Sequence, residues 1–375
     1  MEFRAQKRAL LVIYVAVLSI LTTSTNGGTI VPIFIFGDST MDVGTNNHVA
    51  NCSSTANHPY NGIDYPGSQA TGRYSNGLNT ADSIVQLLGG YDLSPLPYLS
   101  LVEDGSNFTR GIFNGVNFAS GGAGLGKLTV QQFATVQGNI TALLGKSKGD
   151  RLLQKSMYIF SVGSNDIMEY YFTYPRIMTP EQFVINLTDT YAIHLKKLYS
   201  MGARKFGILS IPPIGCCPAA RFASNGTCVN ELNDLARACH ASFESLTKNM
   251  SCTLEGFKYS LANTYNMTMS VITQKIGKHM FSFYIQRLTY SISVISLVST
   301  VRFKDVVSAC CADNSPFGLS ECLKGVHLCK YRDDYLFWDK FHPTQKASKL
   351  AATVVVSSQD PAFVSPINFG SLRKA

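Results

Sequence analysis

Three short apolar runs have the pattern of strands that are buried on both faces of a sheet. The first, residues 31–36, reads Val-Pro-Ile-Phe-Ile-Phe and ends at Gly37 and Asp38. Similar runs occupy residues 157–162 and 205–211, and each is followed by a turn that contains Gly or Pro. Continuous apolar runs bounded by turn residues are typical of strands in parallel sheets. We therefore expect residues 31–36 to form the first strand.

Longer segments between these runs have the periodicity of helices. In residues 181–199, apolar side chains recur at spacings of three and four, which gives one stripe suited to packing on a sheet. The sequence predicts helices over residues 80–88, 179–201, 230–250 and 344–356. Strands that alternate with helices predict an α/β fold in which helices cover both faces of a parallel sheet. In such folds, functional residues lie in loops at the carboxyl ends of the strands.

The first 28 residues have the features of a secretory leader. A basic start with Arg4, Lys7 and Arg8 precedes an apolar run over residues 10–21 and a small, polar exit. The run is short for a membrane span, so we expect no stable membrane insertion; an uncleaved anchor is the alternative. We interpret residues 1–28 as a signal peptide and short leader, and residues 29–375 as a single domain of a secreted, extracellular protein.

The charge of the chain is mildly basic once the leader is set aside. Residues 1–25 hold three basic residues and one acidic residue, so their removal lowers the formal charge from +8 to +6. No Lys/Arg cluster is interleaved with aromatic residues along one face. We therefore expect a protein that does not bind nucleic acid.

All ten cysteines follow the leader, and an even number suits an oxidising compartment. They are Cys52, Cys216, Cys217, Cys228, Cys239, Cys252, Cys310, Cys311, Cys322 and Cys329. The last four could form a zinc cluster, but adjacent cysteines and an export signal favour disulfides. We expect some disulfides and no metal or organic cofactor.

The chain is also rich in Asn-x-Ser/Thr sequons, which are acceptors for N-glycosylation in secreted proteins. The seven candidates are Asn51, Asn107, Asn139, Asn186, Asn225, Asn249 and Asn266. A chain with many Asn, Ser and Thr residues also produces sequons by chance. Together with the leader, they favour a glycosylated secretory protein.

Ser39 is a candidate nucleophile because it stands just beyond the first predicted strand, in the sequence Phe36-Gly37-Asp38-Ser39. A serine there is presented at the carboxyl edge of the sheet, where a following turn offers backbone N–H groups to an oxyanion. Serine in such a position also often caps a helix, so this residue alone does not identify a site.

Asp339 and His342 supply the groups that a serine nucleophile needs. A serine hydroxyl reacts only when a base takes its proton, and the imidazole base needs a carboxylate to hold its tautomer. A separation of three residues allows one loop to deliver both side chains. Pro343 favours an extended His342 and suits the first position of the following helix. The alternative is a capping aspartate beside an ordinary surface histidine.

Two further segments carry candidates for an oxyanion hole. Asn165 follows the run at residues 157–162, and its side-chain amide could donate to a developing oxyanion. The Gly-rich segment 117–124 includes Gly122 and could bring a backbone N–H close to a ligand. This segment is not a phosphate loop because no Gly-Lys-Ser/Thr follows it.

Four segments have now been singled out: in chain order they contain Ser39, residues 117–124, Asn165, and Asp339 with His342. Together and in this order they resemble the GDSL esterase/lipase family within the SGNH hydrolases, and especially its plant-type branch. The resemblance extends over nearly all of residues 31–357 and includes three further blocks. These are Thr71-Gly72-Arg73-Tyr74-Ser75-Asn76-Gly77, Pro212-Pro213-Ile214-Gly215-Cys216-Cys217-Pro218 and Asp305-Val306-Val307-Ser308-Ala309-Cys310-Cys311.

The resemblance implies a three-layer α/β/α sandwich with a flavodoxin-like parallel sheet. It implies that Ser39, Asp339 and His342 are the catalytic triad, and that Gly122 and Asn165 join the Ser39 amide as oxyanion donors. Gly121 and Gly124 are close enough to be confused with Gly122. The implied activity is hydrolysis of small-molecule or lipid carboxylic esters through an acyl-enzyme.

The chain departs from the family pattern at two places. Thr40 stands where the family name has leucine, a position that varies in the plant branch. Residues 277–300 form an apolar insert where the family usually has a shorter connection. Our hypothesis is that about two dozen residues here derive from a mis-spliced or retained segment of the gene, because an exposed apolar segment of this kind is prone to aggregate. The alternative is a functional lid.

Two other classes of protein share this set of motifs. An acyltransferase would use the same acyl-enzyme with an alcohol in place of water. A catalytically inactive lipid- or glycan-binding protein would keep the fold alone, but the intact set of Ser, Gly, Asn, Asp and His residues argues against it.

Overall fold

The computed structural model describes residues 31–173, 177–273, 303–315 and 317–375. Residues Pro32–Ala375 form one compact unit. The predicted signal peptide at residues 1–28 and the apolar insert at 277–300 lie outside the described residues. Among the helices that the structure describes, none is both long enough and apolar enough to span a bilayer.

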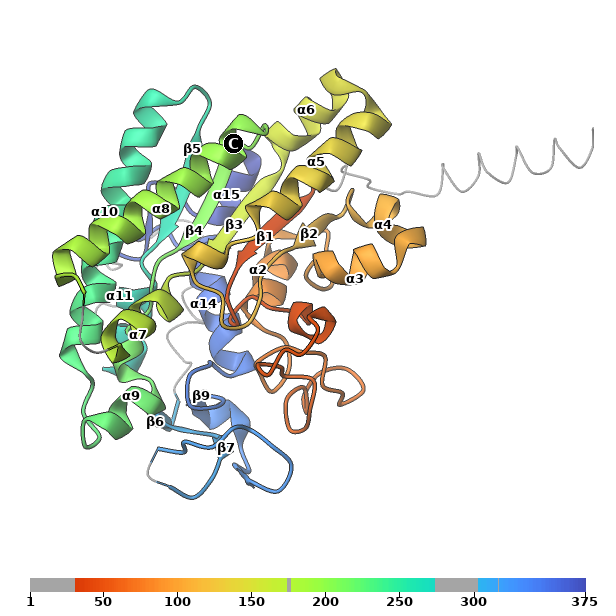
Figure 1. Cartoon of the computed structure of the whole chain (residues 1–375). Helices are drawn as coiled ribbons and strands as arrows, with labels where there is room; N and C mark the ends of the chain where they lie inside the picture. The colour runs from red at the N-terminus through yellow and green to blue at the C-terminus, as the bar shows by residue number, and fades with distance from the viewer. Residues whose placement is uncertain (1–30, 174–176, 274–302, 316) are drawn as a thin grey trace, which may run out of the picture. The chain divides into compact units, whose positions relative to one another are not determined.

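The centre of the unit is a six-stranded sheet with strand order β10-β5-β4-β3-β1-β2 (Figure 1). Its strands are β1 Ile33–Gly37, β2 Gly115–Asn117, β3 Met157–Ser161, β4 Lys205–Leu209, β5 Lys258–Ala262 and β10 Val364–Ser365. The strands from β2 to β5 are all parallel, and only the short edge strand β10 is antiparallel to its neighbour. The order 2-1-3-4-5 is that of flavodoxin-like sheets, so the predicted fold class is confirmed.

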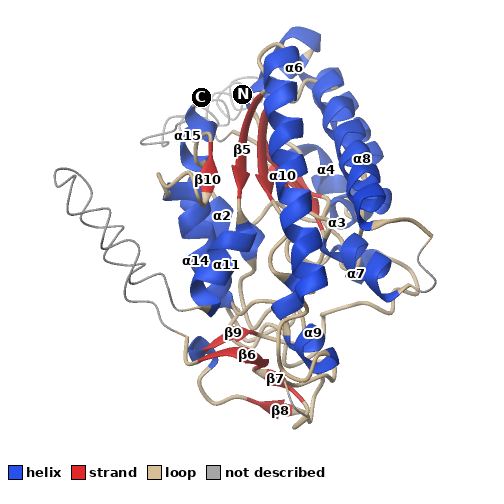
Figure 2. Cartoon of the chain, turned by 90° about the vertical axis from the view of Figure 1, so that its left-hand side faces the viewer, coloured by secondary structure: helices blue, strands red, loops and turns tan. Residues whose placement is uncertain are grey.

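Helices cover both faces of the sheet. They are α2 Thr80–Leu88, α3 Tyr98–Glu103, α4 Gly105–Gly111, α5 Val130–Leu144, α6 Lys146–Lys155, α7 Ser164–Phe172, α8 Pro180–Ser200, α9 Pro218–Ala223, α10 Asn230–Thr253, α11 Thr264–Ile272, α14 Gln345–Ser357 and α15 Phe369–Lys374. Figure 2 shows α8 and α10 on one side of the sheet and α2, α14 and α15 on the other. This arrangement gives the three layers that the sequence predicts.

Strand β1 contributes to two separate cores because successive side chains of a strand point to opposite faces. Phe34 and Phe36 belong to the core under α5, α8 and α10, where Phe36 stacks on a phenylalanine of β3 at 5.0 Å between ring centroids. Ile33 and Ile35 belong to the core under α2, α14 and α15. Burial on both faces explains why this strand reads as a continuous apolar run.

The predicted elements are found with small shifts at their ends. Strands β1, β3 and β4 and helices α2, α8, α10 and α14 each lie at their predicted places. The prediction that Pro343 begins the last helix is wrong. Helix α14 begins at Gln345, and Thr344 is its N-cap, with a side chain that accepts a hydrogen bond from the Ala347 amide.

Two small sheets are formed by residues that precede α14. Strand β6 Asp305–Ala309 pairs with β9 Tyr335–Phe337, and β7 Cys311–Ala312 pairs with β8 His327–Leu328 (Figure 2). The disulfide Cys310–Cys329 joins the residue before β7 to the residue after β8, and Cys311–Cys322 joins β7 to the loop between these two strands. The four cysteines pack in one cluster with the fully buried Trp338. The expectation of disulfides in this cluster is confirmed, and its four sulfur atoms are therefore not zinc ligands.

A third disulfide joins Cys216 and Cys228. The four remaining cysteines, Cys52, Cys217, Cys239 and Cys252, are free thiols. Burial raises the pKa of the Cys217 thiol to about 11, so this group is protonated at neutral pH.

Candidate active site

Ser39 lies two residues beyond the end of β1, in a turn that backbone contacts hold tightly. The Asp38 N–H donates to the carbonyl of Ser161 on β3 at 3.1 Å, and the Asp38 carbonyl accepts from the Asp42 N–H at 3.0 Å. A Cβ atom on Gly37 would lie 2.6 Å from the Ser161 oxygen, so glycine allows the close approach of the two strands. These contacts place Ser39 at the carboxyl edge of the sheet.

Ser39, His342 and Asp339 form a continuous chain of hydrogen bonds. The Ser39 Oγ lies 2.7 Å from His342 Nε2. On the other side of the ring, His342 Nδ1 lies 2.9 Å and 2.8 Å from the Oδ1 and Oδ2 of Asp339. Because a carboxylate only accepts hydrogen bonds, the ring proton is assigned to Nδ1, which leaves Nε2 to accept the serine proton.

The electrostatics of the pair suit a general base. Burial raises the pKa of Asp339, but His342 and the hydrogen bonds to the carboxylate outweigh it and leave that pKa below its ordinary value. Burial lowers the pKa of His342, but the charge of Asp339 and its hydrogen bond outweigh this effect and leave that pKa raised. The arrangement therefore favours an imidazolium once a proton is transferred.

The loop that carries both residues is held from within. Asp339 Oδ1 also accepts the N–H groups of Phe341 and His342, each at 2.8 Å. The Trp338 N–H donates to the His342 carbonyl at 2.7 Å. The Trp338 indole donates to Asn61 Oδ1 at 2.9 Å. These bonds fix the direction in which the His342 ring leaves the backbone.

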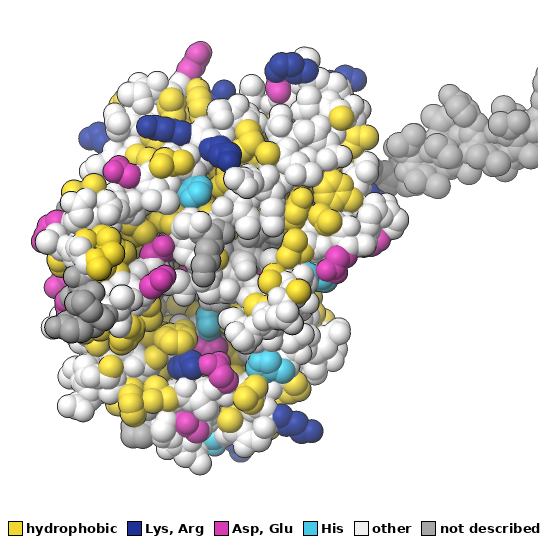
Figure 3. All heavy atoms as spheres, viewed as in Figure 1, with side chains coloured by type: hydrophobic (Ala, Val, Ile, Leu, Met, Phe, Trp, Pro, Cys, Tyr) yellow, Lys and Arg dark blue, Asp and Glu magenta, His cyan; other side chains and the backbone are white. Residues whose placement is uncertain are grey.

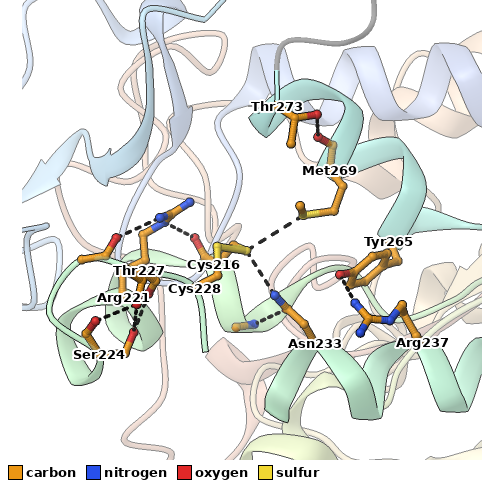
Figure 4. The surroundings of a disulfide bond; sticks show 12 residues. Cys216, Arg221, Ser224, Thr227, Cys228, Asn233, Arg237, Tyr265, Met269 and Thr273 are labelled. Carbon is orange, nitrogen blue, oxygen red and sulfur yellow. Dashed lines mark hydrogen bonds between the residues drawn. A yellow bond between two sulfur atoms is a disulfide. The ribbon is translucent and has the colours of Figure 1, made fainter. Parts of the chain in front are cut away.

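A disulfide supports the same loop from outside. The Ala219 N–H, at the start of α9, donates to the Lys340 carbonyl at 3.1 Å. The disulfide Cys216–Cys228 closes the segment that contains α9, and Asn233 of α10 donates to the Cys216 sulfur at 3.3 Å (Figure 4). Helix α9 is thereby fastened to the long helix α10 while it contacts the loop that carries Asp339 and His342.

The two candidate oxyanion segments are joined to each other. The Gly121 N–H donates to Asp42 Oδ2 at 2.8 Å, so this amide is already in use and Gly122 remains the better candidate. Gly122 is exposed and has a φ of 77°, which favours glycine. The Asn165 amide donates to the Ala123 carbonyl at 2.9 Å. Because that amide carries two N–H bonds, one remains to donate elsewhere.

Comparison with known proteins identifies the family. The family model described as GDSL-like Lipase/Acylhydrolase matches residues 33–355. The chain belongs to this family. The predicted identity of the chain as a GDSL hydrolase is therefore confirmed, and the activity of the family is that of a carboxylic ester hydrolase.

Relatives of the GDSL family match almost the whole chain. One GDSL esterase/lipase of Arabidopsis thaliana is 32% identical over 361 residues, which cover 90% of each protein. A second from the same organism is 30% identical and covers 92% of this chain and 89% of its own length. A solved structure of a putative GDSL-like lipase from Parabacteroides merdae covers 72% of this chain and 92% of its own, at 11% identity. Its TM-score of 0.29 is too low to support an argument.

Asp42 and Asn46 are supporting residues that sequence reasoning missed in this GDSL protein. The buried Asp42 carboxylate accepts the N–H groups of Gly44 and Thr45 in addition to that of Gly121. The Asn46 amide donates to the Gly121 carbonyl at 3.0 Å. In the sequence, Asp42 two residues before Gly44 indicates only a local turn. Its contact with Gly121 could not be predicted, because it depends on the fold.

The block at residues 71–77, which the family resemblance singled out, is connected to helix α2 and to the start of α14. Arg73 and Asp82 form a buried ion pair with two hydrogen bonds, at 2.6 Å and 2.8 Å. Asn76 Oδ1 accepts the N–H of Gln345 at 2.8 Å, and Gln345 Oε1 accepts that of Leu78 at 2.6 Å. The start of α14 is therefore fixed three residues after His342.

The surface of the GDSL protein bears on the other site predictions. In Figure 3, histidine, acidic and hydrophobic side chains lie together in the hollow near the centre of the face, and Lys and Arg side chains are scattered. Six of the seven sequon asparagines are exposed, and Asn139 is partly exposed. Among the described residues, no three His, Cys, Asp or Glu side chains are grouped in a way that could hold a metal ion.

Proposed function

We propose that this GDSL family member is a secreted ester hydrolase in which Ser39 is the nucleophile, His342 the general base and Asp339 the residue that orients the base. The observation that carries the proposal is the hydrogen-bonded chain from Ser39 Oγ to His342, at 2.7 Å, and on to Asp339, at 2.8 Å. We assign the oxyanion hole to the backbone N–H groups of Ser39 and Gly122 and to the Asn165 amide.

The first half of the reaction forms an acyl-enzyme. Ser39 Oγ attacks the ester carbonyl while its proton passes to His342 Nε2, and the carbonyl oxygen becomes an oxyanion that accepts the three N–H donors. The bond from the carbonyl carbon to the alcohol oxygen then breaks. The imidazolium returns its proton to the departing alcohol, so the leaving group departs as a neutral molecule.

The second half releases the acid. Water gives a proton to His342 Nε2 as its oxygen attacks the acyl carbon, and the bond to Ser39 Oγ breaks as that proton is returned to the serine. Asp339 remains ionised in both halves and stabilises the imidazolium. Every proton that leaves a nucleophile reaches a leaving group, so this sequence needs no metal or organic cofactor.

A serine substitution tests the assignment. Purified protein and a Ser39→Ala variant are compared for hydrolysis of short-chain and long-chain p-nitrophenyl esters. We expect kcat to fall by at least about 10⁴ in the variant, because the bond-forming atom is lost while the fold is kept. Ser156→Ala is the matched control. Ser156 is a buried serine directly before the first residue of β3, at the edge of the sheet away from Ser39, and its hydroxyl donates to the Leu152 carbonyl.

The outcome separates three possibilities. Loss of activity in Ser39→Ala alone supports the nucleophile assignment, and the ratio of activities on the two chain lengths then describes the acyl preference. Equal activity in the wild type and Ser39→Ala would show that another residue carries the reaction. Folded wild-type protein that hydrolyses no ester would support an inactive binding protein.

We further propose that residues 1–28 direct secretion and that residues 29–375 form the single catalytic domain. Three disulfides and the exposure of the sequon asparagines support an oxidising, glycosylating compartment. Expression in insect cells of the full chain and of a chain without residues 1–28 tests this proposal. We expect only the full chain to reach the medium, with a new N-terminus near residue 28 and with glycans on several sequons. Full-length protein retained in the cells would refute it.

A further inference from the structure

The His342 imidazole contacts the phenol ring of Tyr74. The two ring centroids are 4.9 Å apart and the ring planes are inclined by 34°. Hydrogen bonds already hold the edge of the imidazole at both nitrogen atoms, to Ser39 and to Asp339. Hydrogen bonds at the edge leave the ring free to tilt about the line that joins them. A tyrosine packed against the ring restricts that tilt.

The hydroxyl of the same tyrosine reaches the Gly-rich loop. It donates to the Ser54 carbonyl at 2.7 Å, and Asn46 Nδ2 lies 3.4 Å from it. Asn46 Nδ2 also donates to the Gly121 carbonyl at 3.0 Å, directly before Gly122. A Cβ atom added to Gly121 would lie only 2.3 Å from the Tyr74 hydroxyl, so the tyrosine and the loop are in close contact. One side chain thus touches the base and the loop that carries an oxyanion donor.

The protonation of the tyrosine is constant in the working range of the enzyme. Burial raises the pKa of Tyr74 to about 12, so the hydroxyl keeps its proton at neutral pH and donates a hydrogen bond. Tyr74 is therefore neither an acid nor a base in the reaction. Its contribution must come from the positions of the groups that it contacts.

We propose that Tyr74 is a positioning residue that couples the general base to the oxyanion hole. Its ring restricts the tilt of the His342 ring. Its hydroxyl, together with Asn46, holds the backbone of Gly121 and Gly122 in place. The His342 imidazole, which accepts the Ser39 proton, and the Gly122 N–H, which donates to the oxyanion, then keep the same relative position through both halves of the reaction. This inference rests on the proposed roles of His342 and Gly122.

Two variants separate the two contacts. Tyr74→Phe keeps the ring and removes the hydroxyl, whereas Tyr74→Leu removes both the ring and the hydroxyl. The control is Tyr91→Phe, because burial also raises the pKa of Tyr91 to about 12 and its hydroxyl also donates to a backbone carbonyl, that of Asn114, at 2.8 Å. Rates are normalised by titration of reactive serine with a p-nitrophenyl phosphonate, so that only competent sites are counted.

We expect kcat to fall about tenfold in Tyr74→Phe and about a hundredfold in Tyr74→Leu, with KM changed by less than about twofold. Tyr91→Phe should keep the wild-type kcat. A loss confined to kcat indicates a group that acts in the transition state, whereas a purely structural tyrosine would lower the number of competent sites or the Tm and leave the normalised kcat unchanged.

Three results would overturn the inference. In the first, the normalised kcat of both Tyr74 variants stays within about twofold of wild type. In the second, their kcat falls no more than that of Tyr91→Phe. In the third, their KM rises while kcat is unchanged. The last result would make Tyr74 a substrate-contacting residue. A failure of the proposed function gives a different result: either Ser39→Ala keeps wild-type activity, or the folded wild type hydrolyses no ester. A failure at Tyr74 alone leaves the wild type active and Ser39→Ala inactive.

Discussion

Replacing Asp339 with asparagine separates its two structural contacts. The carboxylate accepts two backbone N–H groups through Oδ1, at 2.8 Å each, and also holds the His342 ring. Asparagine has nearly the same size, and its one amide oxygen can still accept the backbone N–H groups of the loop. The negative charge beside the imidazole is lost, and an NH2 donor replaces one of the two oxygens that face His342 Nδ1. The variant should therefore fold normally and fail in proton transfer.

The size of the effect follows from the geometry of the pair. With Nδ1 and Oδ2 2.8 Å apart, the charge centres of the imidazolium and the carboxylate are separated by about 4 Å, and such a pair contributes about 4 kcal/mol at an effective dielectric constant of about 20. At about 1.4 kcal/mol for each factor of ten, this corresponds to about 10³ in rate. A wrong tautomer adds to the loss, so we expect kcat to fall about 10³- to 10⁴-fold.

The pH dependence provides a second readout of the same variant. In the wild type, activity should fall as the pH drops through the raised pKa of His342, because the base must be neutral to accept a proton. Without Asp339, burial lowers that pKa with less opposition, since only Asp38 and Glu321 still raise it. The acid limb of the kcat/KM profile should therefore move to lower pH while the plateau falls.

The assay is ester hydrolysis from pH 4 to 9, with Asp305→Asn as the control. Asp305 Oδ1 also accepts two backbone N–H groups, those of Val307 and Ser308 at 2.8 Å and 2.7 Å, but no histidine among the described residues pairs with it. Asp305→Asn should keep the wild-type rate and profile. If Asp339→Asn retained kcat within about tenfold of wild type, with the acid limb unmoved, the carboxylate would only cap the loop and our assignment would be wrong.

Two other predictions concern the oxyanion hole and the disulfides. Asn165→Ala should lower kcat about 10²- to 10³-fold with little change in KM, because the lost N–H acts on the developing oxyanion; a raised KM with normal kcat on a p-nitrophenyl ester would contradict this role. A double variant that replaces Cys311 and Cys322 with alanine removes a link across 11 residues of chain and should lower the free energy of unfolding by about 3 kcal/mol. Guanidinium unfolding measures this change, and an unchanged midpoint would show that the small sheets hold the segment without the bond.

The strands that could be predicted are those whose burial leaves a signal in the sequence. β1, β3 and β4 are interior strands of a sheet covered on both faces, so apart from Lys205 at the start of β4 and Ser161 at the end of β3 their residues form unbroken runs without polar side chains. β2 has only three residues, Gly-Val-Asn, and β10 has two, which is too short for any periodicity. β5 begins with the exposed Lys258 and the partly exposed Tyr259, and its buried part has only three residues, the first of which is the polar Ser260.

The candidate site could be predicted as far as local chemistry reaches. Ser39 follows a recognisable strand, and three residues of spacing bring Asp339 and His342 to one loop, so their proximity to each other could be expected. The roles of these residues stay predictions until the variants are measured. The pairing of the cysteines and the contacts of Asp42 and Asn46 could not be predicted, because they depend on how distant loops close.

The separation of Ser39 and His342 by 303 positions has a consequence for synthesis of the protein. At about 5–20 residues per second, roughly 15 to 60 seconds pass between the addition of the serine and the addition of the histidine. If His342 is the proton acceptor, as we propose, the nascent chain during that time carries Ser39 without its base and should not hydrolyse esters. On the assignment proposed above, a chain interrupted anywhere between the two positions would therefore be inactive, and activity would require that the loop with Asp339 and His342 has been made.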